Sequence, residues 1–157
     1  MKNKFRLCIG LIVATPFALI YHIISLFIGK QKTVTFLGPW MTIFAKSLQQ
    51  FFPPKIYDAS EFELFKSKLK DKQRLWSILY DYPIEYPDDD TAKLNIINCP
   101  FAEAINKLKI SEFGHYICQG DWEVAKKNSE KWLFERSCTI ATGGTICDFT
   151  YKRVKHN

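Results

Sequence analysis

Residues 7–29 form an almost unbroken run of apolar side chains that contains no Asp, Glu, Lys or Arg. A helix of this length crosses a hydrocarbon core of roughly 30 Å, so the run predicts a membrane-spanning helix. Two alternatives stay open. Pro16 and the polar Tyr21, His22 and Ser25 suit a helix that lies at the membrane interface or in the core. A signal peptide is the third reading, although no small-residue cleavage site ends the run.

Basic residues flank the apolar run on both sides, at Lys2, Lys4 and Arg6 before it and at Lys30 and Lys32 after it. This near symmetry gives little information about orientation. Free thiols in the rest of the chain favour the cytosol, because disulfides are rare there. We therefore expect a membrane anchor over residues 1–30, crossing once, and a cytosolic domain over residues 31–157.

The remaining pattern predicts alternating helices and strands. Residues 33–52 read as an amphipathic helix, with Gly38-Pro39 suited to its start, and residues 60–80 read as another. A strand, a polar turn and a strand follow over residues 82–99, then helices over 101–110, 111–118 and 121–130. Two strands close the chain. This order predicts an α+β fold: amino-terminal helices, the first apolar, followed by a small antiparallel sheet with intervening helices.

The last two strands are expected to form a hairpin. Gly143-Gly144 would occupy a two-residue type I′ turn, or the loop would shift back by one residue to Thr142-Gly143. Either register places the same side chains on one largely aromatic face: Trp132, Phe134, Arg136, Cys138, Ile140, Cys147, Phe149 and Tyr151. Asp148 points to the opposite face, so its parity predicts a surface position rather than a catalytic one.

The formal net charge of +6 comes partly from both chain ends and from the GKQK segment rather than from one face. This distribution favours membrane-surface contact over a nucleic-acid groove, and no nucleic-acid-binding motif is present. The five cysteines form no CxxC pair and no regular framework, so they read mainly as reduced, buried thiols. The sequence does not predict an oligomeric state.

Several of these residues carry candidate chemistry. Cys99 precedes Pro100 at a helix start, where unpaired amides favour a thiolate. Cys118 has His115 three residues before it and Asp121 three after, an arrangement that could activate a nucleophile. In a structural reading, Asp121 is instead a helix cap and His115 is exposed. Arg136 on an aromatic face needs a carboxylate, supplied either by an internal acid or by a substrate.

The segments NCPFAEA at 98–104, CQGD at 118–121, FERSCTIATGGTICDFTY at 134–151 and LWSILYDY at 75–82 together resemble the L-2-amino-thiazoline-4-carboxylic acid hydrolase family. The resemblance implies a hydrolase that opens a cyclic amidine by cleaving a carbon–nitrogen bond other than a peptide bond. It implies motif positions at Cys99, Cys118, Asp121 and Cys147.

We accordingly predict a small carboxylate substrate and no resident cofactor. Cys118 is the expected nucleophile, Cys99 the runner-up, and Asp121 and His115 the proton-transfer groups. Arg136, Trp132, Phe149 and Tyr151 are expected to bind substrate, beside Cys147. A non-enzymatic domain that binds a small ligand at a membrane is the alternative. The family is also distantly similar to vinyl-reductase-type domains, which implies zinc on the three cysteines and Asp121 as a further option.

Overall fold

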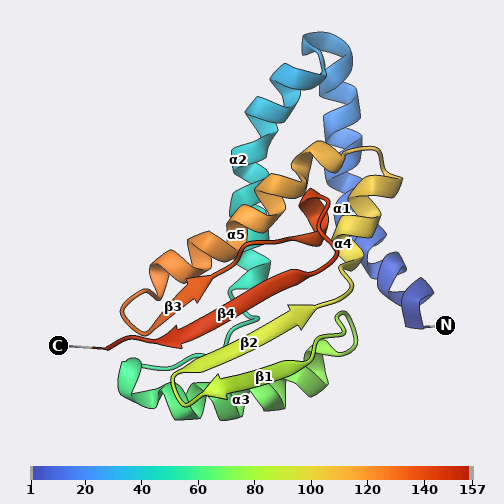
Figure 1. Ribbon diagram of the computed structural model, residues 1–157. Coiled ribbons are helices and arrows are strands. Elements are labelled where there is room, and N and C mark those ends of the chain that lie inside the picture. Colours follow the sequence, from blue (N-terminus) through green and yellow to red (C-terminus); the bar gives the residue numbers. More distant parts are fainter. Residues whose placement is uncertain (1, 156–157) are drawn as a thin grey trace.

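The computed structural model describes residues 2–155 and has an α+β architecture, as the sequence predicts (Figure 1). The elements, in chain order, are α1 (Lys2–Ile28), α2 (Lys30–Gln49), the 3-10 turn η1 (Ala59–Glu61), α3 (Phe62–Trp76), β1 (Ile84–Asp88), β2 (Thr91–Ile96), α4 (Pro100–Lys107), η2 (Ser111–Phe113), α5 (Gly114–Lys127), β3 (Trp132–Glu135), η3 (Ile140–Thr142) and β4 (Cys147–Arg153).

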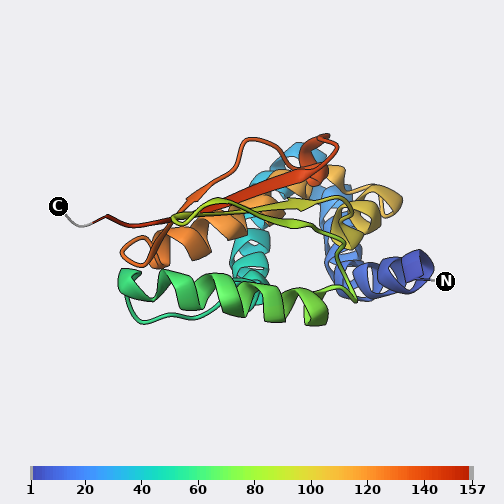
Figure 2. The ribbon, with the colours of Figure 1, turned by 60° about the horizontal axis from the view of Figure 1, so that its bottom comes forward.

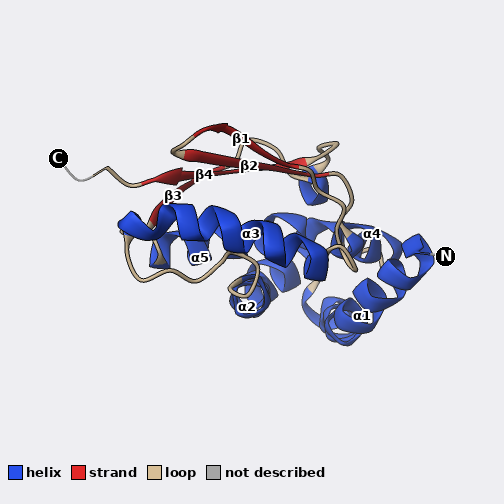
Figure 3. Cartoon of the chain, turned by 90° about the horizontal axis from the view of Figure 1, so that it is seen from below, coloured by secondary structure: helices blue, strands red, loops and turns tan. Residues whose placement is uncertain are grey.

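The four described strands form one antiparallel sheet in the order β1-β2-β4-β3. The labelled α-helices lie on one side of this sheet (Figure 3). Alternate residues of β4 are buried against them, as expected where one face of a sheet meets water. The main hydrophobic core includes residues of α3 and of the sheet. Phe62, Phe65 and Leu69 of α3 are fully buried in it and join Leu94 and Tyr151 of the sheet.

The helices α1 and α2 form a helical hairpin whose tip is at Gly29 (Figure 1). Its two legs diverge toward the sheet, and α3 lies beneath the sheet next to them (Figure 2). A second core cluster fills the inner side of the hairpin, where Tyr21 of α1 and Leu37 of α2 meet Phe113. Gly10 allows close approach of α1 to α4, because a Cβ there would lie 2.4 Å from the carbonyl oxygen of Pro100.

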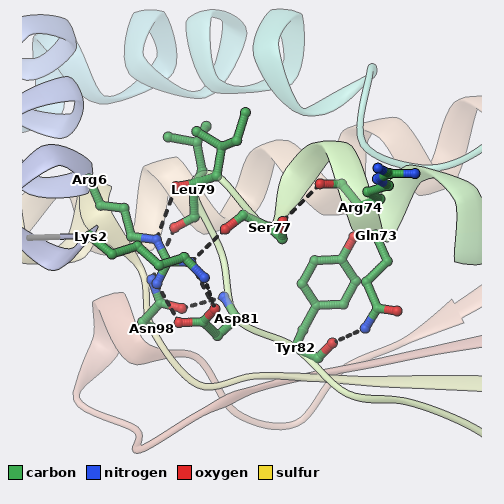
Figure 4. Close-up of polar contacts among 10 residues, drawn as sticks. Lys2, Arg6, Gln73, Arg74, Ser77, Leu79, Asp81, Tyr82 and Asn98 are labelled. Atoms are coloured by element: carbon green, nitrogen blue, oxygen red, sulfur yellow. Dashed lines mark hydrogen bonds and ion pairs between the residues drawn. The ribbon is translucent and has the colours of Figure 1, made fainter.

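The amino-terminal end of α1 is tied to the segment between α3 and β1 by a buried cation. Arg6 is 2% exposed, and its Nη2 donates to an Asp81 carboxylate oxygen at 2.8 Å and to the Ser77 carbonyl at 2.7 Å. Lys2 reaches the same carboxylate at 2.9 Å (Figure 4). A buried guanidinium needs such a partner. The ion pair therefore fixes α1 to the body of the protein.

The outer faces of α1 and α2 are apolar and exposed. In α1, the most apolar 18-residue window has a mean hydropathy of 2.2 and is only 22% buried. Large apolar side chains are exposed along both helices: Ile12, Leu19, Ile20, Ile23, Leu26 and Phe27 in α1, and Phe36, Trp40, Ile43 and Phe44 in α2. One described helix, α1, is thus long and apolar enough to cross a membrane, a property that core helices and signal sequences share.

Two predicted helix boundaries are wrong. The helix α2 begins at Lys30 rather than at Gly38-Pro39, because Val34 and Leu37 pack in the core before the proline and extend the helix. The predicted helices 111–118 and 121–130 are one helix, α5, so Asp121 lies inside a helix and does not cap one. Burial along α5 overrides the weak helix propensity of Gly120.

The predicted tight hairpin over the last two strands is also wrong. Residues 136–146 form a longer connection that contains η3, although β3 and β4 pair with Phe134 opposite Tyr151, the shifted register. Gly143 adopts a φ of 99° at the end of η3, which suits glycine. A Cβ on Gly144 would lie 2.2 Å from the Cys138 sulfur. The glycines therefore close a compact loop instead of a two-residue turn.

Candidate functional site

A cavity of about 430 Å³ lies between the legs of the helical hairpin and the sheet. This size falls within the range of small-molecule sites in proteins. Apolar side chains from α1, α2, α4 and α5 form most of its wall, and Ile96, Cys147 and Phe149 contribute from the sheet. We call it the apolar cavity.

Four residues predicted from three sequence motifs meet on the wall of the apolar cavity. Cys99 comes from the start of α4, Cys118 and Asp121 from one face of α5, and Cys147 from the first position of β4. Cys118 and Asp121 share a face because residues three apart in a helix are neighbours. The fold thus brings together candidate reactive side chains that are spread over about fifty positions of the sequence.

Cys99 lies at the start of α4, as the sequence predicts, and its thiol caps the helix, but it is not set up as a thiolate. The Ala102 amide donates to its sulfur at 3.4 Å, which favours the anion. Burial outweighs this contact and raises the pKa of the Cys99 thiol to about 12. At neutral pH the thiol therefore keeps its proton.

Burial also keeps the other two cavity thiols protonated. It raises the pKa of Cys147 to about 12, although the Ile140 amide donates to this sulfur at 3.3 Å. Burial raises the pKa of Cys118 as well, while contacts with Thr139 and Arg136 act in the opposite direction. A nucleophilic role for any of these thiols consequently requires a neighbouring base.

Asp121 and Arg136 form a largely buried ion pair between α5 and the β3–β4 connection. Arg136 Nη1 lies 2.7 Å from Asp121 Oδ2 and donates to the Cys118 carbonyl at 3.1 Å. The guanidinium lies 5.6 Å from the ring centroid of Trp122 and 5.8 Å from that of Phe149. The internal acid that the sequence left as one of two possible partners for Arg136 is therefore present.

Burial raises the pKa of Asp121 to about 7, against the attraction of Arg136. A carboxyl group with a pKa near neutrality exists in both protonation states under ordinary conditions. Such a group can accept a proton and return it, which is the property that general acid–base catalysis uses. Asp121 is thus the titratable group of the cavity wall best suited to proton transfer.

A smaller polar pocket of about 220 Å³ shares Cys118 with the apolar cavity. Arg136, Thr139 and Gln119 line it together with His115, which is exposed. His115 is therefore on the same pocket as Cys118, but it does not line the apolar cavity. Its ring contacts Tyr116 at a centroid distance of 5.7 Å.

The predicted substrate-binding aromatic residues separate into two groups. Phe149 lines the apolar cavity. Trp132 and Tyr151 do not: they pack against each other and against Phe65 in the main core, with the two rings 5.1 Å apart. The prediction that Trp132 and Tyr151 share a face of the sheet with Phe149 is confirmed, but that face extends beyond the cavity.

Asp148 has a structural role beside the site. Its carboxylate accepts hydrogen bonds from the Ser137 and Cys138 amides and from the Ser137 hydroxyl. These bonds lower the pKa of Asp148 below its ordinary value, against the opposing effect of burial. Asp148 thereby fixes the connection that carries Arg136, while Cys147 before it faces the cavity.

Among the wall residues that were not predicted, three carry polar groups: Gln49 of α2 and Trp76 and Tyr80 near the end of α3. Burial raises the pKa of Tyr80 well above its usual value, and Cys99 and Asp121 add to the effect. A signal for two of them existed, since Trp76 and Tyr80 belong to the LWSILYDY segment. Nothing in the local pattern distinguishes Gln49.

The described residues include no group of three or more His, Cys, Asp or Glu side chains placed to hold a metal ion. The three cysteines share one cavity wall without forming a ligand cluster. The zinc option therefore has no support in the arrangement of residues 2–155.

Comparison with known protein families finds a match. The family model described as L-2-amino-thiazoline-4-carboxylic acid hydrolase matches residues 17–151. This range includes the second half of α1, all of α2 to β3, and β4 as far as Tyr151. It therefore contains the whole cavity wall except its contributions from Ile9, Val13 and Ala14. No curated protein matches the chain.

Proposed function

The chain belongs to the L-2-amino-thiazoline-4-carboxylic acid hydrolase family, and from this premise we propose that it hydrolyses a carbon–nitrogen bond of a cyclic amidine. The reaction would take place at the buried wall of the apolar cavity. The observation that carries the proposal is the meeting of Cys118, Asp121, Cys99 and Cys147 on this wall. Asp121, with its pKa near neutrality, supplies the proton-transfer group that a buried thiol requires.

In the proposed mechanism, Asp121 takes the thiol proton of Cys118 as the sulfur bonds to the amidine carbon. The ring carbon–nitrogen bond then breaks, and the departing nitrogen receives that proton from Asp121. Water attacks the same carbon in a second step, and the Cys118 sulfur leaves and recovers a proton. The net reaction adds one water across the carbon–nitrogen bond.

Arg136 has two proposed roles. Its ion pair orients Asp121 toward Cys118 and stabilises the carboxylate form of Asp121. Its presence on the polar pocket supports the second role, as partner of a substrate carboxylate, for which guanidinium offers bidentate geometry. His115 on the same pocket would contact the substrate from the exposed side. Cys99 and Cys147 would line the site as neutral thiols.

The mechanism is tested with single variants assayed on 2-amino-thiazoline-4-carboxylate and related cyclic amidines. Cys118→Ser and Asp121→Asn should each lower kcat by about a hundredfold or more. Cys138→Ser is the matched control, because Cys138 lines neither pocket. Full turnover by folded Cys118→Ser would transfer the nucleophile role to Cys99 or rule out a cysteine mechanism. Arg136→Lys separates its two roles, since loss of a clamp chiefly raises KM.

A second candidate function is non-enzymatic binding of a small ligand. The raised pKa values of all three cavity thiols favour it, because neutral thiols are poor nucleophiles. In that case Cys118→Ser would leave ligand affinity unchanged, and no cyclic amidine would be turned over. Native mass spectrometry of the purified protein, with and without added ligand, distinguishes this function from hydrolysis.

We further propose that the protein works at a membrane, which it contacts through residues 7–29 and through α2. The support is the exposed apolar surface of both helices, flanked by basic residues at the amino terminus and at the hairpin tip. Because Arg6, Gly10 and Tyr21 hold α1 against the rest of the protein, we favour insertion of the hairpin at the interface. Crossing by α1 alone, with a cytosolic domain, stays a prediction.

Carbonate extraction of membranes tests this association. A protein that crosses the bilayer resists extraction, whereas an interfacial one is released in part, and a protein without membrane affinity is found entirely in the soluble fraction before extraction. Flotation with vesicles that contain anionic lipid provides a second measurement. The double change Leu26→Ser and Phe27→Ser, at the hairpin tip, should weaken flotation without unfolding the protein, because both side chains are 83% exposed.

A further inference from the structure

The wall of the apolar cavity is more apolar than the binding of a small polar carboxylate would require. None of the described residues that line it is Lys, Arg or His, and its single charged group is Asp121. The other polar groups on the wall are few: three thiols, the Gln49 amide, the Tyr80 hydroxyl and the Trp76 indole N–H. A wall of this kind favours an apolar ligand body and disfavours an anionic group.

The cavity has a buried end and an exposed end. At the buried end Cys118 and Cys147 are 8% and 6% exposed, next to Asp121. At the other end, Phe44 and Phe51 of the α2 region line the cavity and yet are 46% and 55% exposed. Asp121, Cys118 and Cys147 therefore form the buried polar end of the wall, whereas the exposed residues at the mouth are apolar.

The mouth is continuous with the apolar outer surface of the helical hairpin. Phe44 and Leu48, one turn apart on α2, both line the cavity and are exposed, and Trp40, one turn before Phe44, belongs to the outer surface. A ligand with an apolar chain could thus move between this surface and the cavity without exposing its chain to water.

We propose that the natural ligand of the cavity is an amphiphile with one extended apolar chain and a compact amide or amidine head. The head lies at Asp121 and Cys118, and the chain runs toward the mouth between α1 and α2. An amidinium could donate hydrogen bonds to the Asp121 carboxylate, whereas a carboxylate head would find no cation among the residues that line this cavity, because Arg136 lines the polar pocket instead. This inference rests on the proposed function, because it places the scissile carbon–nitrogen bond beside Cys118 and names the substrate class.

Three simple probes separate the contributions of head and chain. Dodecanamidine has both the chain and the cationic head, acetamidine has the head alone, and dodecanoate has the chain with an anionic head. Calorimetric titration at pH 8, below micelle-forming concentrations, measures their affinities. We expect dodecanamidine to bind roughly a hundredfold or more tightly than acetamidine, because burying methylenes is favourable. It should also bind more tightly than dodecanoate, and Asp121→Asn should abolish this second difference.

A pair of adjacent variants localises the chain. Val13 of α1 is half-buried and lines the cavity, so Val13→Trp should fill the path of the chain and weaken dodecanamidine binding by roughly tenfold or more. Ile12→Trp is the matched control, because Ile12 is 67% exposed and does not line the cavity. Thermal unfolding of both variants shows whether the fold is kept. Met41→Trp, from α2, gives an independent obstruction if Val13→Trp does not fold.

The outcomes distinguish this inference from the proposed reaction. Equal affinity for dodecanamidine and acetamidine, or unchanged binding in folded Val13→Trp and Met41→Trp, would overturn the amphiphile proposal even if cyclic amidines are hydrolysed. Tight, chain-dependent binding by wild type and by Cys118→Ser, with no turnover of any amidine, would support the ligand class and reject the hydrolase mechanism.

Discussion

Arg136 and Asp121 join the connection between β3 and β4 to the middle of α5 through a contact of 2.7 Å. Both side chains are largely buried, at 7% and 16% exposure, so each depends on the other for compensation of its charge. The pair also borders both pockets, with Asp121 on the apolar cavity and Arg136 on the polar one. Stability and the proposed function are therefore linked at this contact.

Removal of the Arg136 cation should destabilise the protein most at pH values at which Asp121 is ionised. Arg136→Met leaves a buried carboxylate without a partner, which costs about 3 kcal/mol in comparable buried pairs. The loss should be clear at pH 8 and smaller at pH 5, because protonation of Asp121 removes the uncompensated charge. Urea unfolding at both pH values measures it. Adding Asp121→Asn should restore part of the stability at pH 8, and an equal loss at both pH values would exclude the explanation.

The raised pKa of Asp121 predicts how stability depends on pH. Burial raises this pKa to about 7, well above its value of about 4 in an unfolded chain. Between these values the folded state binds more protons than the unfolded state, so this group lowers the free energy of unfolding as pH rises from about 4 to 7. Wild type and Asp121→Asn should therefore differ in the slope of stability against pH across that range. Parallel curves would contradict the prediction.

Asp81 should contribute with the opposite sign. Its hydrogen bond with Arg6 holds the pKa of Asp81 well below its ordinary value. The stabilisation it provides is present above about pH 4 and is lost as pH falls further. Asp81→Asn should weaken the attachment of α1, lower the unfolding midpoint at pH 7 and reduce the sensitivity to acid. Glu85→Gln is a suitable control, because Glu85 is an exposed acid on β1.

Thiol labelling should distinguish one cysteine from the cavity set. Cys8 is exposed on α1, whereas burial raises the pKa values of Cys99, Cys118 and Cys147. Because thiolates are the reactive species, iodoacetamide at pH 8 should modify Cys8 first and the cavity thiols much more slowly. Mass spectrometry after timed quenching identifies the sites. Rapid labelling of Cys118 in folded protein would show that its thiol is activated before substrate binds.

The two glycines of the β3–β4 connection should differ in their tolerance of alanine. Gly143→Ala adds a methyl group into open space but strains a φ of 99°, which costs roughly 1–2 kcal/mol. Gly144→Ala should cost more, because its Cβ would lie 2.2 Å from the Cys138 sulfur and 2.8 Å from the Thr139 carbonyl oxygen. Chemical denaturation of both variants provides the comparison. A milder effect at Gly144 would indicate that the loop can rearrange.

The sequence predicts what depends on local pattern. The α+β class, the helical character of residues 60–76 and the shared face of Cys147 and Phe149 all follow from periodicity. The merging of two predicted helices into α5 does not, because Gly120 fits a helix there only through close packing on α2. Tertiary contact overrides a local helix break at that position.

The sequence predicted which residues belong to the candidate site, but it did not predict how the fold brings them together. Cys99, Cys118, Asp121 and Cys147 come from motifs, whereas their meeting in a cavity depends on how α4, α5 and β4 pack. The partner of Arg136 was one of two alternatives, and only the distance to Asp121 identifies it. The apolar character of the cavity was not foreseen, because its wall combines α1, α2 and the end of α3, which are remote from the motifs.

The position of α1 has a practical consequence for preparing the protein. An apolar amino-terminal helix is commonly deleted to obtain a soluble sample. Here Val13 and Phe17 form part of the wall of the apolar cavity, and Gly10 lies against the backbone that follows Cys99. A truncated protein that begins after residue 30 would therefore have this cavity open on one side and Asp81 without Arg6. Loss of activity in such a sample would reflect the removal of part of the cavity wall rather than the loss of attachment to the membrane.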